Sequence, residues 1–249
     1  MKTEWDYSDL AVAYLKRPDY SVTAIDSMLT LAGVSSTSRV CDVGAGVAHL
    51  TLLLSNRAYH VDAVEPNDAM RQNGVRRTSS RENVLWFEGT GENTGRDDYS
   101  YDLVTFGSSF NVCDRILALR ETARILKPRG WFACMWNHRR LDDPVQEQIE
   151  SIIRDGVPSY TYGSRREDQS DIIRSSALFS EPIRISADVI HQQTISECVE
   201  AWRSHATLER QAGVHFTQVV QEIDSYLKSL RVETIEIPYT TNIWLAQLR

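Results

Sequence analysis

Short apolar runs alternate with helix-like stretches between residues 39 and 136. Segments with helical periodicity or turn residues separate five runs that have the length and composition of buried strands. These predicted strands cover residues 39–43, 60–64, 83–87, 102–106 and 131–136. Because strands that alternate with helices form right-handed βαβ units, the pattern predicts an α/β fold with a parallel sheet.

Helices are predicted before and between these strands. The first spans residues 21–33, and Ser21 is placed to cap it. Asn67 is placed to cap a short helix that stops near Gly74. Two more helices are expected at residues 48–57 and 114–126.

The alternation ends after residue 136. The pattern then predicts a polar, largely helical insertion, a sixth strand, a helical segment and a final β-rich run. These cover residues 137–180, 183–190, 195–231 and 233–248. No internal repeat or low-complexity segment occurs in the sequence.

Composition narrows the function classes. The 249 residues are 42% hydrophobic and 24% charged, which is typical of a globular chain. The length fits one large domain, or a core domain with an insertion. The formal net charge of −7 argues against a general binder of nucleic acid or anionic membranes, because such a protein needs a basic face.

Targeting signals and cysteines point to the cytoplasm. Residues 1–30 carry charges throughout and contain no apolar region of a secretory leader. No apolar run approaches the ~18 residues that a membrane-spanning helix needs. The four cysteines form no CxxC pair, which favours reduced, buried thiols over a metal site. We therefore expect a cytoplasmic protein without a metal.

A glycine turn follows the first predicted strand, in the sequence Asp42-Val43-Gly44-Ala45-Gly46. Two glycines let the backbone turn tightly and let a ligand lie against it. Glu65 closes the second strand, where a carboxylate can accept hydrogen bonds from both hydroxyls of a ribose. A purely structural turn is the alternative for the glycines alone. Asp42 would repel a pyrophosphate and suits a ligand with a cationic amine and a sulfonium.

The glycine turn and four later motifs, in this order along the chain, resemble those of the class I S-adenosylmethionine-dependent methyltransferases. The resemblance is to their small-molecule branch. The resemblance extends from residue 38 to residue 137. It includes the first motif, the second motif, the segment beside the adenine, the fourth strand with its ligand loop, and the leucine-rich motif before the fifth strand. These lie at residues 42–46, 64–70, 88–93, 101–110 and 124–132.

The resemblance implies a Rossmann-like fold. The sheet should be mostly parallel and seven-stranded, with helices on both faces, an N-terminal helical lid and a helical insertion. The implied units are a lid at residues 1–37 and a core at residues 38–137 that binds S-adenosylmethionine. Residues 138–249 would supply a substrate cap and the last strands of the sheet.

The resemblance also implies cofactor contacts. Asp42, Gly44 and Gly46 would border the methionine part of S-adenosylmethionine, and Glu65 would hold the ribose. The remaining core candidates are Asn67, Met70, Thr90, Gly91, Glu92, Gly107 and Ser108. Core packing is the alternative role for Met70, and a solvated loop position is the alternative for Glu92.

The N-terminal segment contributes further cofactor candidates. Similar small-molecule methyltransferases carry a Tyr/Arg-rich helix that closes over the cofactor. Arg17 would hold the methionine carboxylate, and Tyr7 or Tyr14 would lie near the sulfonium, since aromatic faces stabilise cations. An ordinary amphipathic helix packed on the sheet is the alternative.

Candidates for catalysis lie where the fourth and fifth strands end, at the ligand-facing edge of an open α/β sheet. They are Asn111, Asn137 and His138, with Arg139 beside them and Tyr14 from the lid. His138 suits a general base because imidazole titrates near neutrality, although a surface histidine is the alternative.

Acceptor-binding candidates lie mostly in the insertion. They are Asn137, Tyr160, Tyr162, Arg165 and Arg166, with Trp202, Arg203, His205 and Tyr239 as weaker candidates. A solvated helix face is the competing interpretation.

These features predict an enzyme that transfers the methyl group of S-adenosylmethionine in line to a small molecule, such as a secondary metabolite, and releases S-adenosylhomocysteine. Positioning can lower the barrier by ~7–11 kcal/mol without an acid–base pair. One alternative is a lyase of the same fold that cyclises S-adenosylmethionine to azetidine-2-carboxylate and methylthioadenosine. An RNA-modifying enzyme and a non-catalytic binding protein are further alternatives.

Overall fold

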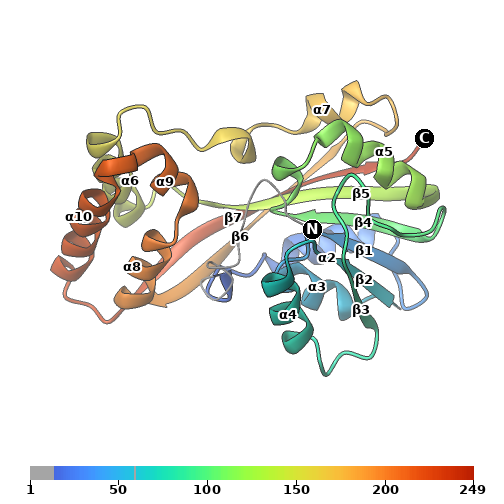
Figure 1. Cartoon of the computed structure of the whole chain (residues 1–249), viewed down its shortest axis with the longest axis horizontal. Helices are drawn as coiled ribbons and strands as arrows, with labels where there is room; N and C mark the ends of the chain where they lie inside the picture. Colours follow the sequence, from blue (N-terminus) through green and yellow to red (C-terminus); the bar gives the residue numbers. More distant parts are fainter. Residues whose placement is uncertain (1–13, 59) are drawn as a thin grey trace.

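The computed structural model describes residues 14–58 and 60–249, and its centre is a seven-stranded sheet (Figure 1). The strand order is β3-β2-β1-β4-β5-β7-β6. The first five strands are β1 (Arg39–Val43), β2 (His60–Val64), β3 (Val84–Phe87), β4 (Tyr101–Gly107) and β5 (Leu126–Arg139). These five are parallel, whereas β7 (Thr234–Gln247) is antiparallel to both β5 and β6 (Ile183–Thr194). The predicted mostly parallel α/β sheet is confirmed.

Helices cover both faces of the sheet (Figure 1). The helices α2 (Val22–Leu31) and α3 (His49–Ser55) bury their apolar side chains against one face. The helices α5 (Arg115–Ile125) and α7 (Ser170–Ser175) pack on the other. Apolar burial on both faces is what drives this layered arrangement. Within the described residues, no helix is both long and apolar enough to span a membrane.

A side-chain cap fixes the start of the helix that follows β2. Asn67 caps α4 (Asp68–Arg77) by accepting a hydrogen bond from the amide of Met70 at 3.0 Å. The predicted end of this helix near Gly74 is wrong. Gly74 lies inside α4. A Cβ at this position would be only 2.1 Å from the ring of Trp86, so the glycine permits close packing of the helix on that ring.

Two of the last three strands, β5 and β6, extend beyond the predicted ranges. Strand β5 continues to Arg139, which pairs with Tyr239, and β6 continues to Thr194, which pairs with Thr234. This long ribbon runs from the sheet into a separate helical group at one end of the molecule (Figure 1). The helices of this group are α6 (Pro144–Gly156), α8 (Ile195–Arg203), α9 (Ala206–Ala212) and α10 (Phe216–Ser229).

The helical group has a hydrophobic core of its own. It is built from α6, α8, α9 and α10 together with the near end of β7. The helical segment predicted at residues 195–231 is interrupted, because the His205 side chain caps α9 and Gly213 takes a positive φ of 50° after it. We call this group the cap helices.

Candidate functional site

The carboxylate of Glu65 joins the end of β2 to the glycine turn after β1. One of its oxygens accepts a hydrogen bond from the amide of Gly46 at 2.9 Å, and the other accepts one from the amide of Asn67 at 2.8 Å. Glu65 is 7% exposed, and burial raises its pKa. Gly46 has a positive φ of 56°, and a Cβ at this position would meet no atom within 4 Å. The backbone there is therefore open on one side.

Gly44 is needed for a close approach between two loops. Its φ is +68°, and a Cβ would lie 2.4 Å from the Cβ of Ser109. Ser109 follows β4 and donates a hydrogen bond from its hydroxyl to the carbonyl of Val43 at 2.6 Å. The loops after β1 and β4 consequently touch, as expected at the ligand-facing edge of a parallel sheet.

Asp42 lies beneath the glycine turn and is fully buried. Its two oxygens accept hydrogen bonds from the hydroxyls of Thr51 at 2.7 Å and Thr105 at 3.0 Å. Burial raises the pKa of Asp42 to about 6, although both hydroxyls work in the opposite direction. The carboxylate therefore connects the end of β1 to α3 and β4 through the two threonines.

The loop after β3 is held against the start of α5. Thr90 accepts the amide of Asn93 on its hydroxyl at 3.2 Å, and Glu92 accepts the amide of Asp114 at 2.7 Å. A Cβ on Gly91 would lie 2.4 Å from the Sγ of Cys113. Glu92 thus has a defined partner, and this loop is closely packed on the segment before α5.

Met70 is 3% exposed and packs against Val47 of the glycine turn and Tyr14 of the N-terminal segment. Asn67 uses its side chain as the helix cap of α4. Both residues therefore have structural partners in addition to their predicted place beside the ribose and adenine.

The N-terminal segment, residues 14–20, lies over the same edge of the sheet. Tyr20 shares a hydrogen bond between its hydroxyl and that of Ser108 at 2.9 Å, and Ser108 holds a positive φ of 58°. A Cβ on Gly107 would lie 3.0 Å from the Tyr20 hydroxyl oxygen. The guanidinium of Arg17 stacks 3.6 Å from the ring centroid of Tyr14. The contacts of Tyr20 bring the end of this segment next to the β4 loop, which carries the predicted cofactor residues Gly107 and Ser108.

His49 ties this segment to the first turn of α3. Its Nδ1 is 2.6 Å from a carboxylate oxygen of Asp19, and its Nε2 is 2.8 Å from the carbonyl oxygen of Tyr14. Each ring nitrogen of His49 thus faces an oxygen of the N-terminal segment. The side-chain hydrogen bond with His49 lowers the pKa of Asp19.

Asn137 anchors the same segment from β5. Its amide donates to the carbonyl oxygens of Pro18 and Asp19, at 3.2 and 3.0 Å, and its oxygen accepts the Thr241 hydroxyl at 2.5 Å. The side chain that was predicted for catalysis and acceptor binding therefore has three protein partners. It holds the segment in place over the strand ends.

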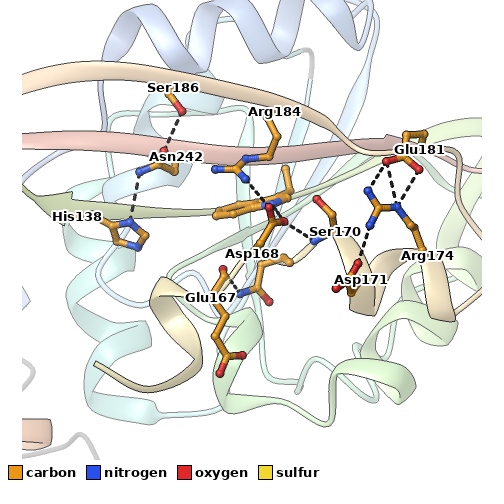
Figure 2. A network of polar contacts seen from close by, with 12 residues as sticks. His138, Glu167, Asp168, Ser170, Asp171, Arg174, Glu181, Arg184, Ser186 and Asn242 are labelled. Carbon is orange, nitrogen blue, oxygen red and sulfur yellow. Dashed lines mark hydrogen bonds and ion pairs between the residues drawn. The ribbon is translucent and has the colours of Figure 1, made fainter. Parts of the chain in front are cut away.

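The other catalytic candidates have partners away from the glycine turn. The oxygen of Asn111 accepts the indole N–H of Trp136 at 3.0 Å. His138 accepts the amide of Asn242 on Nδ1 at 3.3 Å, and Asn242 in turn accepts the Ser186 hydroxyl at 2.8 Å. Figure 2 shows His138 in this chain across β5, β7 and β6.

The acceptor candidates of the insertion lie beside the cap helices. The hydroxyl of Tyr162 donates to Glu150 of α6, and the ring of Tyr162 meets that of Tyr160 with centroids 5.3 Å apart. Arg166 stacks 4.1 Å from the centroid of Tyr162 and donates to the carbonyl of Arg139 at 3.1 Å. The structure brings these residues together with one another.

Two predicted site residues lie outside what the structure describes, Tyr7 entirely and Arg165 in its side chain.

The sequence prediction did not include several residues that the structure places near the glycine turn. Thr51, Ser109 and His49 each lie close to the glycine turn in space. His49 and Thr51 directly follow the turn in sequence, which was the only available signal.

The sequence prediction also did not indicate that Asp168 bonds to three other segments of the chain. It accepts hydrogen bonds from the indole of Trp244 and the amide of Ser170, both at 2.8 Å, and it pairs with Arg184 at 2.8 Å (Figure 2). The hydrogen bonds from Ser170 lower the pKa of Asp168. These contacts fasten the start of α7 to β6 and β7.

The segment that contains the glycine turn matches a known protein family. Residues 41–134 match the family described as a methyltransferase domain. An uncharacterized methyltransferase of Mycobacterium tuberculosis is 38% identical over 144 residues, which is 57% of this chain and 56% of the relative. A demethylmenaquinone methyltransferase of Staphylococcus epidermidis is 33% identical over 112 residues, or 43% and 46% of the two chains. The chain thus matches about half the length of these relatives.

Solved structures share the fold over nearly the whole chain. A candidate type II methyltransferase from Anaeromyxobacter dehalogenans has a TM-score of 0.68 at 17% identity, covering 94% of this chain and 97% of its own. The geranyl diphosphate C-methyltransferase of Streptomyces coelicolor, solved with S-adenosylhomocysteine, has a TM-score of 0.50 at 15% identity, covering 91% and 75%. Residues 41–134 are therefore similar to a methyltransferase domain, and the chain shares its fold with solved methyltransferase structures.

Proposed function

We propose that this protein transfers the methyl group of S-adenosylmethionine to a small-molecule acceptor and releases S-adenosylhomocysteine. The observation that carries the proposal is Glu65, whose carboxylate is held at the end of β2 by the amides of Gly46 and Asn67. Each carboxylate oxygen can accept a second hydrogen bond. Glu65 therefore keeps acceptor capacity for the two hydroxyls of a ribose.

The residues around Glu65 fit the rest of the cofactor. The open side of Gly46 leaves room for a ligand against the backbone. The buried carboxylate of Asp42 beneath the turn favours a ligand that carries positive charge. We assign the methionine end to Gly44, Gly46, Gly107, Ser108 and Arg17, and the adenine end to Asn67, Met70, Thr90, Gly91 and Glu92.

The chemistry follows from this placement. The sulfonium of the bound cofactor supplies a methyl group that is already activated for displacement. The protein has to hold the acceptor atom in line with it, exclude water and let the acceptor lose its proton. We assign water exclusion to the N-terminal lid, with Tyr14 near the sulfonium. Asn137 and His49 fix the described part of the lid in place.

The acceptor side is assigned to residues 138–249. The demethylmenaquinone methyltransferase and the geranyl diphosphate C-methyltransferase described above are named after small molecules, which supports a small-molecule acceptor. The acidic net charge of −7 supports the same choice over a nucleic acid. The thiols of Cys41, Cys113, Cys134 and Cys198 are all reduced, which supports the cytoplasm as the place of action.

Isothermal titration calorimetry with S-adenosylhomocysteine tests the cofactor site. We expect binding to the wild-type chain and loss of at least tenfold in affinity for Glu65→Ala. Equal affinity of both proteins would overturn the assignment.

Incubation with S-adenosylmethionine alone tests the reaction. Methylthioadenosine and a cyclic amino acid formed without an acceptor would establish the cyclising lyase instead.

A further inference from the structure

The guanidinium of Arg139 lies among aromatic rings at the end of β5. It is 4.0 Å from the ring centroid of Trp202, and its Nε donates to the hydroxyl of Tyr239 at 2.9 Å. Both aromatic residues are less than 10% exposed. Among residues 14–58 and 60–249, no carboxylate forms an ion pair with Arg139. A charge in such surroundings is costly unless a counterion joins it.

A second guanidinium adds to the positive charge. Arg166 donates to the carbonyl of Arg139 and stacks on Tyr162. Burial lowers the pKa of Arg166, and the charge of Arg139 adds to this effect. Glu150, a carboxylate that faces Arg166, already accepts hydrogen bonds from Tyr162 and Arg154. The cluster therefore has more positive than negative charge.

Unused hydrogen-bond donors lie in the same part of the molecule. The indole N–H of Trp202 is buried without an acceptor, and Trp202 is 4% exposed. The side-chain amide nitrogen of Gln146, on α6, is likewise buried without an acceptor in a residue that is 2% exposed. Buried polar groups in folded proteins normally have partners. Both orphan groups are donors, so each could bind an acceptor oxygen of a ligand.

The strand register places this cluster relative to the proposed cofactor site. Met135 of β5 pairs with Gly107, at the end of β4, and Arg139 follows four residues later. At ~3.3 Å per residue, Arg139 is about 13 Å farther along the strand. An acceptor that reaches the methyl group from the cap helices would pass along this strand.

We propose that Arg139 binds the anionic group of the methyl acceptor, a carboxylate or a phosphate, between the rings of Trp202 and Tyr239. A guanidinium can donate two parallel hydrogen bonds to either oxyanion, and the flanking rings suit a planar or apolar portion of the acceptor. This inference rests on the proposed function, because it names the class of acceptor for that reaction.

Calorimetry with three probes tests the inference: benzoate, phenyl phosphate and their neutral analogue benzamide. We expect at least one of the two anions to bind the wild-type chain tenfold or more tightly than benzamide, a difference of about 1.4 kcal/mol. The anion that binds more tightly distinguishes a carboxylate from a phosphate. In Arg139→Gln the preference for the anion should fall to less than twofold.

Arg184→Gln is the matched control. Arg184 also stacks on an indole, 4.2 Å from the centroid of Trp244, but it has a carboxylate partner in Asp168 (Figure 2). Its substitution should leave the anion preference intact. Arg139→Lys keeps the charge and loses the planar guanidinium, so it should retain only part of the anion preference. This variant also tests the inference if Arg139→Gln does not fold.

Three results would overturn the inference: equal binding of all three probes, binding of none, or an anion preference that survives Arg139→Gln in a folded protein. Titration of each variant with S-adenosylhomocysteine separates the two proposals. Absence of that binding in the wild-type chain, together with a normal anion preference, would contradict the proposed methyltransferase reaction and retain Arg139 as an anion site.

Discussion

The amide of Gly46 donates a hydrogen bond to the carboxylate of Glu65 across 2.9 Å, which connects the turn after β1 to the end of β2. The same carboxylate accepts the amide of Asn67 at the start of α4. One side chain thus sets the spacing between two loops that the cofactor would contact. Substitution at Glu65 should therefore change both the affinity for the ribose and the geometry of its surroundings.

Glu65→Gln separates these two effects. The amide oxygen can still accept one of the two backbone hydrogen bonds, but the charge and one acceptor are lost, so the folded structure should persist with weaker cofactor binding. We expect affinity for S-adenosylhomocysteine to fall at least tenfold, measured by calorimetry. Glu181→Gln serves as the control, because Glu181 pairs with Arg174 near α7. A Gln variant that binds like the control would remove Glu65 from the ribose site.

Gly44 and Gly46 should respond differently to alanine. Both have positive φ, which costs an alanine ~1–2 kcal/mol. At Gly44 the added Cβ would also collide with Ser109, which should cost a further ~1–3 kcal/mol. Urea unfolding should therefore show a larger loss of stability for Gly44→Ala than for Gly46→Ala. Ser109→Gly should recover part of the loss in the double variant, and failure of this rescue would contradict the close approach of the two loops.

The buried carboxyl of Asp42 should make stability depend on pH. Its pKa is about 6 in the folded chain, mainly because of burial, against 3.8 for the ordinary side chain. Between these values the folded chain binds the additional proton, so the contribution of Asp42 to stability is fully present below pH 3.8 and is lost as pH rises to about 6. The contribution is about 3 kcal/mol.

Asp42→Asn removes this titration. The free energy of unfolding of the wild-type chain relative to the Asn variant should fall as pH increases from 4 to 6.5. In Thr51→Val the carboxylate loses a donor that lowers its pKa, so the decline should begin at the same pH and continue to a higher pH. Parallel pH profiles for the wild-type chain and Asp42→Asn would show that this carboxyl titrates at its ordinary value.

Asn137→Ala should loosen the N-terminal segment. The substitution removes both hydrogen bonds to the carbonyls of Pro18 and Asp19, and it leaves the Thr241 hydroxyl without an acceptor. We expect faster hydrogen exchange at residues 14–20 and a weaker affinity for S-adenosylhomocysteine. Asn73→Ala is the control, because Asn73 lies on α4 and bonds within that helix. Unchanged exchange at residues 14–20 would contradict the anchoring role.

The sequence was sufficient for features that depend on local pattern. Alternation of apolar runs and helices predicted the parallel strands, and Asn67 was identifiable as a cap because its side chain acts three residues ahead. Gly74 misled the prediction, because the reason for the glycine is the distant ring of Trp86. The ends of β5 and β6 were also too short, since pairing with β7 extends them.

Long-range contacts explain why the candidate site was only partly predictable. The roles of Asn137 and Asp42 depend on Pro18, Thr51 and Thr105, and no local spacing links these five residues as a group. The cluster around Arg139 likewise combines the ends of β5 and β7 with α8. A strand pattern predicts which edge of a sheet faces a ligand, but contacts between separate segments decide which side chains meet there.

The central claim is methyl transfer to an acceptor that is a different molecule from the cofactor. Its most direct test is incubation with S-adenosylmethionine that carries a deuterated methyl group, with and without a small-metabolite extract, followed by mass spectrometry. We predict S-adenosylhomocysteine and one deuterium-labelled methyl product only when the extract is present. Methylthioadenosine formed without the extract, or no turnover under either condition, would contradict the claim.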